Sequence, residues 1–295
     1  MKERKGRAVT LFLCALLCLF LAPLLSSCLD LGAPSTATEP PRDTTPVVLP
    51  APEEIGPQVT VPAYTGEKQL SRLTLSDADK QRNAQLTVVI DAGHGQKDAG
   101  VIAMLDGRDV EEKTVNLALA LRLEVLLKEM GFKVETVRRD DRALLGAAGE
   151  DYDTDDEAEA RRLWAESLPA DIYISLHCNS AGTDAEGSRI FFNGRVGVSF
   201  AGRAVAERFR ASLNLMYAEE IAGGEMPAVE SYHLNPQQNP YIVLKSKDMP
   251  AFLFEVGFMT NDAELRRLTD GNYLWEYAGA LADAVCTANR EGLLD

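Results

Sequence analysis

From residue 86 to the end of the chain, short apolar runs alternate with longer segments of helical composition. The runs predict strands at 86–90, 132–137, 171–176, 188–192, 241–244 and 252–256, and the segments predict helices at 113–130, 199–216 and 272–288. Several runs are apolar throughout, as expected of strands that are covered on both faces. The pattern therefore predicts a single α/β domain over residues 86–295, with a mostly parallel central sheet covered by helices on both faces.

An acidic segment at 150–159 interrupts this alternation. Three alternating aspartates in it are spaced like the first ligands of a calcium loop. However, the sixth position is Asp156 instead of glycine and the twelfth is Arg162 instead of glutamate. We expect a solvated acidic loop here.

The first 28 residues have the pattern of an export signal. A basic start precedes an apolar run from Ala8 to Leu25, and the sequence Leu-Ser-Ser-Cys that ends at Cys28 resembles a bacterial lipobox. The resemblance implies that residues 1–27 are a lipoprotein signal peptide and that Cys28 receives a lipid. The alternative is an uncleaved transmembrane anchor. Both interpretations place the rest of the chain outside the cytoplasm and at the cell membrane.

Residues 28–85 are expected to form a Pro/Thr-rich tether between the lipid anchor and the domain. Eight of the 14 prolines lie within residues 29–66. A stretch of this composition buries too little apolar surface to offset the entropy lost on ordering.

Charge and cysteine content exclude two classes of function. The formal net charge is −15, so phosphate backbones would repel the chain and nucleic acid is excluded as a partner. The chain has no Cys-x-x-Cys pattern, which excludes a thiolate metal site. Beyond the leader, Cys178 and Cys286 are either a disulfide or two buried thiols.

Two of the three histidines lie just after predicted strands. His94 follows the first strand between two glycines, and His177 ends the strand at 171–176. Ligands of an open α/β sheet bind beyond the carboxyl ends of its strands, so both are candidate metal ligands. The third, His233, falls in a predicted loop at 217–240, which either lines the crevice or leaves this histidine exposed.

Carboxylates complete the candidate site. Glu111 and Glu112 open the helix predicted at 113–130, where the helix dipole alone also favours an acid. Glu255 lies inside an apolar strand, where a carboxylate is costly to bury unless it is paired or liganded. Two histidines, one glutamate and an open position make a catalytic zinc set, with a further glutamate available as general base.

The motifs around these residues resemble those of a known family. Residues 87–290 resemble the zinc-dependent N-acetylmuramoyl-L-alanine amidases of the amidase 3 type. The matching pieces, in order, are 89–95, Glu112-Lys113 with Asn116-Leu117, 175–180, and 254–258 with Thr260-Asn261.

The resemblance implies both the reaction and the residues that perform it. His94, Glu112 and His177 would bind Zn²⁺, and Glu255 would activate or orient the attacking water. The substrate would be peptidoglycan, cleaved by a zinc-activated water at the amide between N-acetylmuramic acid and the L-alanine of the stem peptide. Asn179, and Lys245 where the family commonly has arginine, are candidate substrate-binding residues.

Two other functions stay open. The chain could be a non-catalytic wall-binding lipoprotein with an amidase fold, or a zinc peptidase acting on stem peptides.

Some similar amidases carry a long insert whose helix plugs the zinc site, whereas here only six residues, 193–198, follow the strand at 188–192. We therefore expect an uninhibited site that needs no obligate activator. We also expect the chain to be a monomer.

Overall fold

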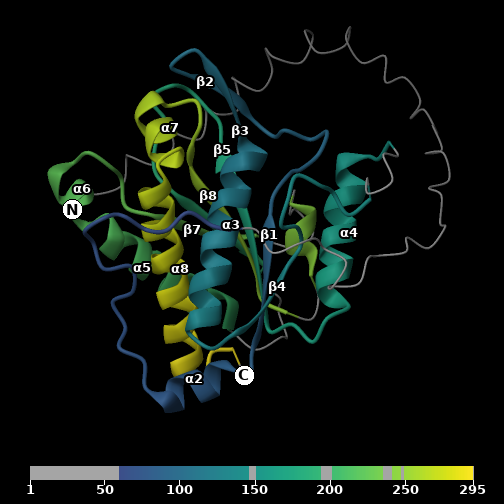
Figure 1. Ribbon diagram of the computed structural model, residues 1–295, viewed down its shortest axis with the longest axis vertical. Coiled ribbons are helices and arrows are strands. Elements are labelled where there is room, and N and C mark those ends of the chain that lie inside the picture. The colour runs from purple at the N-terminus through teal and green to yellow at the C-terminus, as the bar shows by residue number, and fades with distance from the viewer. Residues whose placement is uncertain (1–59, 146–150, 194–200, 235–240, 247–248, 295) are drawn as a thin grey trace, which may run out of the picture. The chain divides into compact units, whose positions relative to one another are not determined.

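The computed structural model describes residues 60–145, 151–193, 201–234, 241–246 and 249–294 (Figure 1). The predicted leader, Cys28 and the first part of the tether lie outside these residues, as does most of the connection at 193–198. None of the helices formed by the described residues is long and apolar enough to cross a membrane.

A six-stranded sheet forms the centre of the described domain, in the order β4-β1-β5-β8-β6-β7. The strands are β1 (Thr87–Ala92), β4 (Lys133–Thr136), β5 (Ile172–Asn179), β6 (Arg189–Asn193), β7 (Glu230–Leu234) and β8 (Ala251–Phe258). The strands β4, β1, β5 and β8 are parallel, whereas β6 is antiparallel to β8 and parallel to β7. The prediction of a mostly parallel sheet is confirmed.

Helices cover both faces of this sheet. The helices α3 (Glu112–Glu129), α5 (Ala201–Met216) and α8 (Gly271–Arg290) lie on one side, and α4 (Thr154–Glu166) lies on the other with the 3₁₀ helix η2 (Ile242–Lys245) (Figure 1). Strand β1 shows why two layers form: Val88 and Ile90 enter the larger apolar cluster, and Val89 enters the smaller one. Alternate side chains of one buried strand thus serve two cores.

A β-hairpin, β2 (Ile102–Leu105) and β3 (Arg108–Glu111), lies between β1 and α3 and was not predicted. Its turn is Asp106-Gly107, and both residues have positive φ values, 49° and 78°. Such a turn matches the twist of a hairpin, and Asp-Gly is a common sequence signal for it. The hairpin leads directly into the first turn of α3, which carries Glu112.

Two expected elements are corrected. The predicted strand at 241–244 is the 3₁₀ helix η2, which packs against α4 and not into the sheet. The predicted acidic loop at 150–159 contains the start of α4, where Asp153 accepts a hydrogen bond from Asp155 N at the N-cap. Acidic side chains in a first helical turn are favoured by the dipole, so a run that looked like a solvated loop begins a helix.

The predicted boundary between tether and domain at residue 86 is too late. Trp275 Nε1 donates to the Pro62 carbonyl at 2.8 Å, and Ser71 Oγ donates to Asp283 Oδ1 at 2.6 Å. The helix α2 (Asp77–Asn83) also precedes residue 86. A few apolar side chains in this segment pack on the core: Val61, Tyr64, Leu70, Leu73 and Leu75. Because they are widely spaced among polar residues, the sequence pattern did not reveal that the segment packs on the domain.

The segment expected as a loop at 217–240 is also partly regular. It contains the short helix α6 (Ala218–Gly223) and the edge strand β7. One further short helix, α7 (Asp262–Leu268), follows β8.

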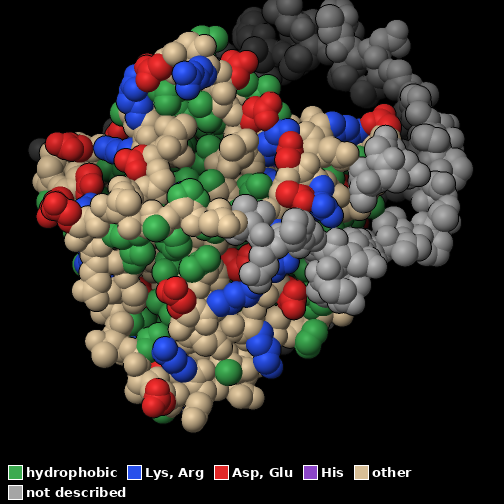
Figure 2. All heavy atoms as spheres, in the orientation of Figure 1, with side chains coloured by type: hydrophobic (Ala, Val, Ile, Leu, Met, Phe, Trp, Pro, Cys, Tyr) green, Lys and Arg blue, Asp and Glu red, His purple; other side chains and the backbone are tan. Residues whose placement is uncertain are grey.

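Acidic and basic side chains are interspersed on the face drawn in Figure 2. Ion pairs between distant segments also occur in the domain, such as Arg266 with Asp106 and Arg290 with Asp79. On this face the charges are therefore mixed, and no single sign dominates.

Candidate metal centre and active site

The loop after β1 places His94 under tight geometric constraints. His94 has a φ of 62°, which is uncommon for a residue other than glycine. A Cβ added at Gly93 would lie 2.3 Å from the His177 ring. Glycine at 93 is therefore required for the close approach of the two histidines.

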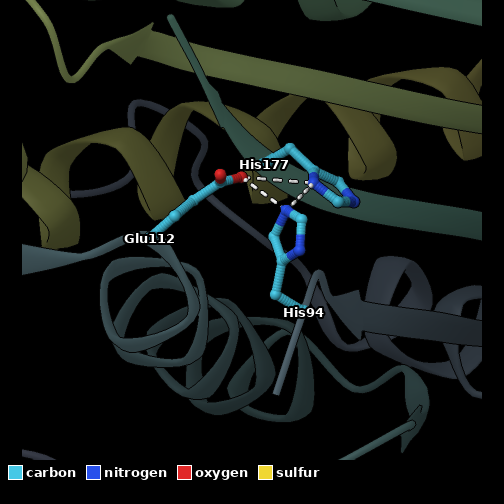
Figure 3. Close-up of side chains that lie close together, drawn as sticks. All are labelled: His94, Glu112 and His177. Carbon is cyan, nitrogen blue, oxygen red and sulfur yellow. Dashed lines mark hydrogen bonds and ion pairs between the residues drawn. The ribbon is translucent and has the colours of Figure 1, made fainter. Parts of the chain in front are cut away.

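Three donor atoms converge where this loop, the end of β5 and the start of α3 meet (Figure 3). His94 Nε2 lies 3.1 Å from Glu112 Oε1, and His177 Nδ1 lies 3.2 Å from both of those atoms. Glu112, and not Glu111, supplies the carboxylate; the Glu111 side chain is more exposed and pairs with Lys113. The expected ligands are brought together, and they form a possible metal-binding group among the described residues.

The spacing and chemistry of these atoms fit a zinc ion. A tetrahedral zinc with ligands at about 2.0–2.1 Å would hold its donor atoms about 3.3–3.4 Å apart, close to the separations observed here. His94 Nδ1 lies 2.8 Å from Asp98 Oδ2, so a proton held there leaves the Nε2 lone pair directed at the other two ligands. Lone pairs of this kind repel one another unless a cation lies between them.

The electrostatics of the site favour a cation. Burial lowers the pKa of His94, but hydrogen bonds to Asp98 and Glu112 outweigh burial and raise that pKa to about 9. Burial raises the pKa of Glu112, yet the two histidines outweigh burial and hold that pKa well below its usual range. The carboxylates thus stabilise positive charge at the point where the donor atoms converge.

The backbone fixes the Glu112 carboxylate. Its Oε1 accepts from Cys178 N at 2.8 Å, and its Oε2 accepts from Val101 N at 2.9 Å. Asn116 Nδ2 also donates to Oε1 at 3.3 Å. Cys178 and Cys286 are both free and buried, so of the two possibilities left open, the buried thiols are observed.

Glu255 lies beside the three ligands on the next strand, β8. It pairs in register with His177, and its Oε2 has no hydrogen-bond partner among the described residues. Burial raises the pKa of Glu255 to about 6, although His177 opposes the shift. A buried, unpartnered carboxylate with this pKa is suited to proton transfer near neutral pH.

These groups line a cleft of about 350 Å³. Asn179, a candidate substrate-binding residue, is part of its wall, together with Tyr241 and the first turns of α4. Lys245 is exposed on η2 and is not among the residues that line the cleft. His233 lies exposed on β7 with its ring 5.5 Å from that of Phe192, and none of the described residues 217–234 lines the cleft.

Two buried arginines, to which the sequence alone assigned no role, support the His94 loop. Arg161 on α4 donates to Asp91 Oδ1 at 2.9 Å and to the His94 carbonyl at 2.7 Å. Arg138 donates to the carbonyls of Ala92 and Gly93 at 2.8 and 3.0 Å. The one available signal was Asp91, an acid that ends an apolar strand and therefore needs a buried partner.

Fold and site together define a class. An α/β sheet that places two histidines and a glutamate at its carboxyl edge, beside a further buried glutamate, has the arrangement of a metal-dependent hydrolase. Residues 88–287 match the family model of N-acetylmuramoyl-L-alanine amidase (Amidase_3). The match covers more than half of the sequence, and the chain belongs to this family.

Individual relatives agree with the family match. The uncharacterized protein YqiI of Bacillus subtilis (strain 168) is 26% identical, and the match covers 68% of this chain and 82% of YqiI. The N-acetylmuramoyl-L-alanine amidase LytC of the same strain is also 26% identical, and the match covers 69% of this chain and 36% of LytC. The chain thus spans about a third of the length of LytC. A solved structure, the catalytic domain of the N-acetylmuramoyl-L-alanine amidase CwlV from Bacillus (Paenibacillus) polymyxa var. colistinus, is 28% identical with a TM-score of 0.53, covering 68% of this chain and 96% of that domain.

The predictions of the α/β amidase fold and of an enzyme of this family that acts on peptidoglycan are confirmed. Zinc, the roles of single residues and the lipid anchor stay predictions.

Proposed function

We propose that the chain is a zinc-dependent amidase that cleaves peptidoglycan between N-acetylmuramic acid and the L-alanine of the stem peptide. The observation that carries this proposal is the convergence of His94, Glu112 and His177 within 3.2 Å of one another. Glu255, the proposed base, lies on the adjacent strand, and its Oε2 has no hydrogen-bond partner within the described ranges of the chain.

Each residue of the site would have a separate role in the reaction. A zinc ion held by His94, Glu112 and His177 supplies a Lewis acid that polarises a carbonyl and lowers the pKa of water. Glu255 takes a proton from the attacking water and returns it to the leaving nitrogen. Asp98 keeps the proton of His94 on Nδ1, so that Nε2 stays available as a ligand.

Two alternatives predict different products. A zinc peptidase with the same ligands would cut within the stem peptide and leave its first residue on the sugar. A non-catalytic wall-binding protein would produce no fragments. The presence of all three ligands and of Glu255 favours catalysis, because a binding module gains nothing from an unpaired buried carboxylate.

We further propose that the chain works outside the cytoplasm, attached to the membrane through a lipid on Cys28. The lipobox-like sequence before Cys28 supports this anchor. The chain would act as a monomer without an obligate activator. The position of the described residues 217–234 outside the cleft lining supports an open site.

Digestion of purified peptidoglycan tests the reaction. The zinc-loaded chain without its leader is incubated with peptidoglycan and no partner protein, and the products are identified by mass spectrometry. Free stem peptides with an L-alanine amino terminus are the expected result. Trimmed peptides that remain attached to sugar would instead identify a peptidase, and activity that requires an added protein would contradict the uninhibited site.

A further inference from the structure

Four charged or ionisable side chains form one row across the sheet at the edge that carries the metal centre. Glu255 on β8 pairs in register with His177 on one side and with Arg189 of β6 on the other. Arg189 in turn pairs with Glu230 on β7. Residues paired in register project to the same face, so the row extends from the metal ligand to the sheet edge.

Arg189 is a half-buried cation in this row. Its guanidinium carbon lies 4.6 Å from the centre of the Phe258 ring. Glu230, which pairs with it in register, instead accepts a hydrogen bond from Tyr232. No ion pair is formed by Arg189 within the part of the chain that the structure describes. Arg189 also forms a hydrogen bond with the Tyr232 side chain. A guanidinium carries five N–H donors, so stacking on a ring and one such bond leave other N–H groups at its edge available for a carboxylate.

The rest of the cleft has the opposite charge. The charged residues that line it, apart from the two histidines, are Glu112, Asp155 and Glu255, and no lysine or arginine is among the lining residues. The proposed zinc ion would offset two of these three negative charges, so the lining residues themselves offer no positive charge to an anionic part of a substrate, whereas Arg189, one strand beyond Glu255, does.

The substrate carries an anion at a suitable separation. In a stem peptide the second residue is a glutamate joined through its side-chain carboxyl, so its α-carboxyl remains free or is converted to an amide. This group lies about two residue lengths, about 7 Å, from the scissile amide. Adjacent strands are about 4.8 Å apart, so the Arg189 backbone lies about 10 Å from that of His177. The Arg189 side chain is long enough to cover the difference between this distance and the separation of about 7 Å in the substrate.

We propose that Arg189 binds the free α-carboxylate of the second stem residue and makes the enzyme selective for stems in which that group is not amidated. The inference rests on the proposed amidase function and adds a specificity residue to it. Arginine pairs with a carboxylate through two parallel hydrogen bonds, which a carboxamide cannot reproduce.

The test compares two defined substrates, N-acetylmuramoyl-L-alanyl-γ-D-glutamyl-L-lysine and its counterpart in which the glutamate α-carboxyl is an amide, so that the γ-carboxyl is joined to the next residue in both. Full-length enzyme, purified in detergent and loaded with zinc, should show a kcat/KM about 10–100 times higher for the carboxylate, as expected for a charge-assisted pair. Arg189→Gln should remove this preference by lowering kcat/KM for the carboxylate substrate alone. Arg189→Lys, which keeps the charge but loses the fork, should give an intermediate ratio.

The control is Arg203→Gln, because Arg203 is exposed on α5 at the opposite face and its loss changes the net charge equally. It should leave the ratio unchanged. If Arg189→Gln lowers kcat/KM equally for both substrates, or if the wild-type enzyme cleaves both equally well, the specificity role is refuted while the amidase function stands. If the wild-type enzyme cleaves neither these substrates nor peptidoglycan, the proposed function itself is refuted and the inference falls with it.

Discussion

His177 and Glu255 occupy register-paired positions on the parallel strands β5 and β8. A proposed metal ligand and a proposed base are therefore fixed relative to each other by the backbone hydrogen bonds of the sheet. The register shifts directly after this pair, between His177 and Asn179. Bulges of this kind often lie next to active sites, because they redirect the side chains that follow.

Removal of one ligand tests the metal centre. In His177→Ala the chain should lose most of its bound zinc, because three protein ligands leave no redundancy. Metal content after gel filtration measures this directly. Glu255→Gln is the matched control, since it alters a neighbouring group that is not a ligand and should keep one zinc per chain. Full occupancy in His177→Ala would remove His177 from the ligand set.

Glu255→Gln should retain fold and zinc but lose about 10²–10⁴-fold in turnover, because the amide cannot accept a proton. The pH profile of the wild-type enzyme provides a second readout. Burial raises the pKa of Glu255 to about 6, and the base must be ionised to act. Activity should therefore fall as the pH drops through about 6, or lower where bound zinc reduces this pKa. The residual activity of Glu255→Gln should lack this acid limb; near-normal turnover would make Glu255 structural.

Arg161→Met should destabilise the domain by about 3–5 kcal/mol, because it leaves two buried carboxylates, Asp91 and Glu157, without their partner. Unfolding by denaturant measures the change. The control Arg266→Met breaks an exposed pair with Asp106 and should cost less than about 1 kcal/mol. Equal losses in the two variants would show that the buried network contributes no special stability.

Cys28→Ser should move the protein from the membrane fraction to the soluble fraction, since the lipid would be its only anchor once the leader is cleaved. Fractionation and immunoblotting follow the change. Cys286→Ser serves as the control, because this thiol is buried in the domain and should not affect location. A Cys28→Ser protein that stays in the membrane fraction would show that residues 1–27 act as an uncleaved anchor.

Local sequence was enough to predict most of the sheet and the four polar groups of the site. The strands around Val89, Ile174 and Phe254 are buried and largely apolar, and burial on both faces gives such runs a clear signal. His94, His177 and Glu255 were conspicuous because polar groups are costly at the ends of buried strands and inside them.

The sequence was less informative where a charged residue has a distant partner. The acidic run at 150–159 could not be distinguished from a solvated loop, because its helix is stabilised in part by buried contacts. The Glu157 carboxylate accepts hydrogen bonds from Arg161 Nε and from the backbone N–H groups of Leu144 and Leu145. Likewise Arg161 meets Asp91 across 70 residues of chain, a separation at which no local pattern applies.

The sequence by itself determined which segments are buried and which polar residues are candidates for the site, because a polar group is costly among apolar neighbours and so stands out in a buried strand. Only the tertiary structure decided the direction of β6, and with it the place of Arg189. Antiparallel pairing with β8 brings the first residue of β6 to the edge where the parallel strands end. Strand direction depends on how the chain returns to the sheet and not on the alternation within a strand, so Arg189 came beside Glu255 without any signal in the sequence.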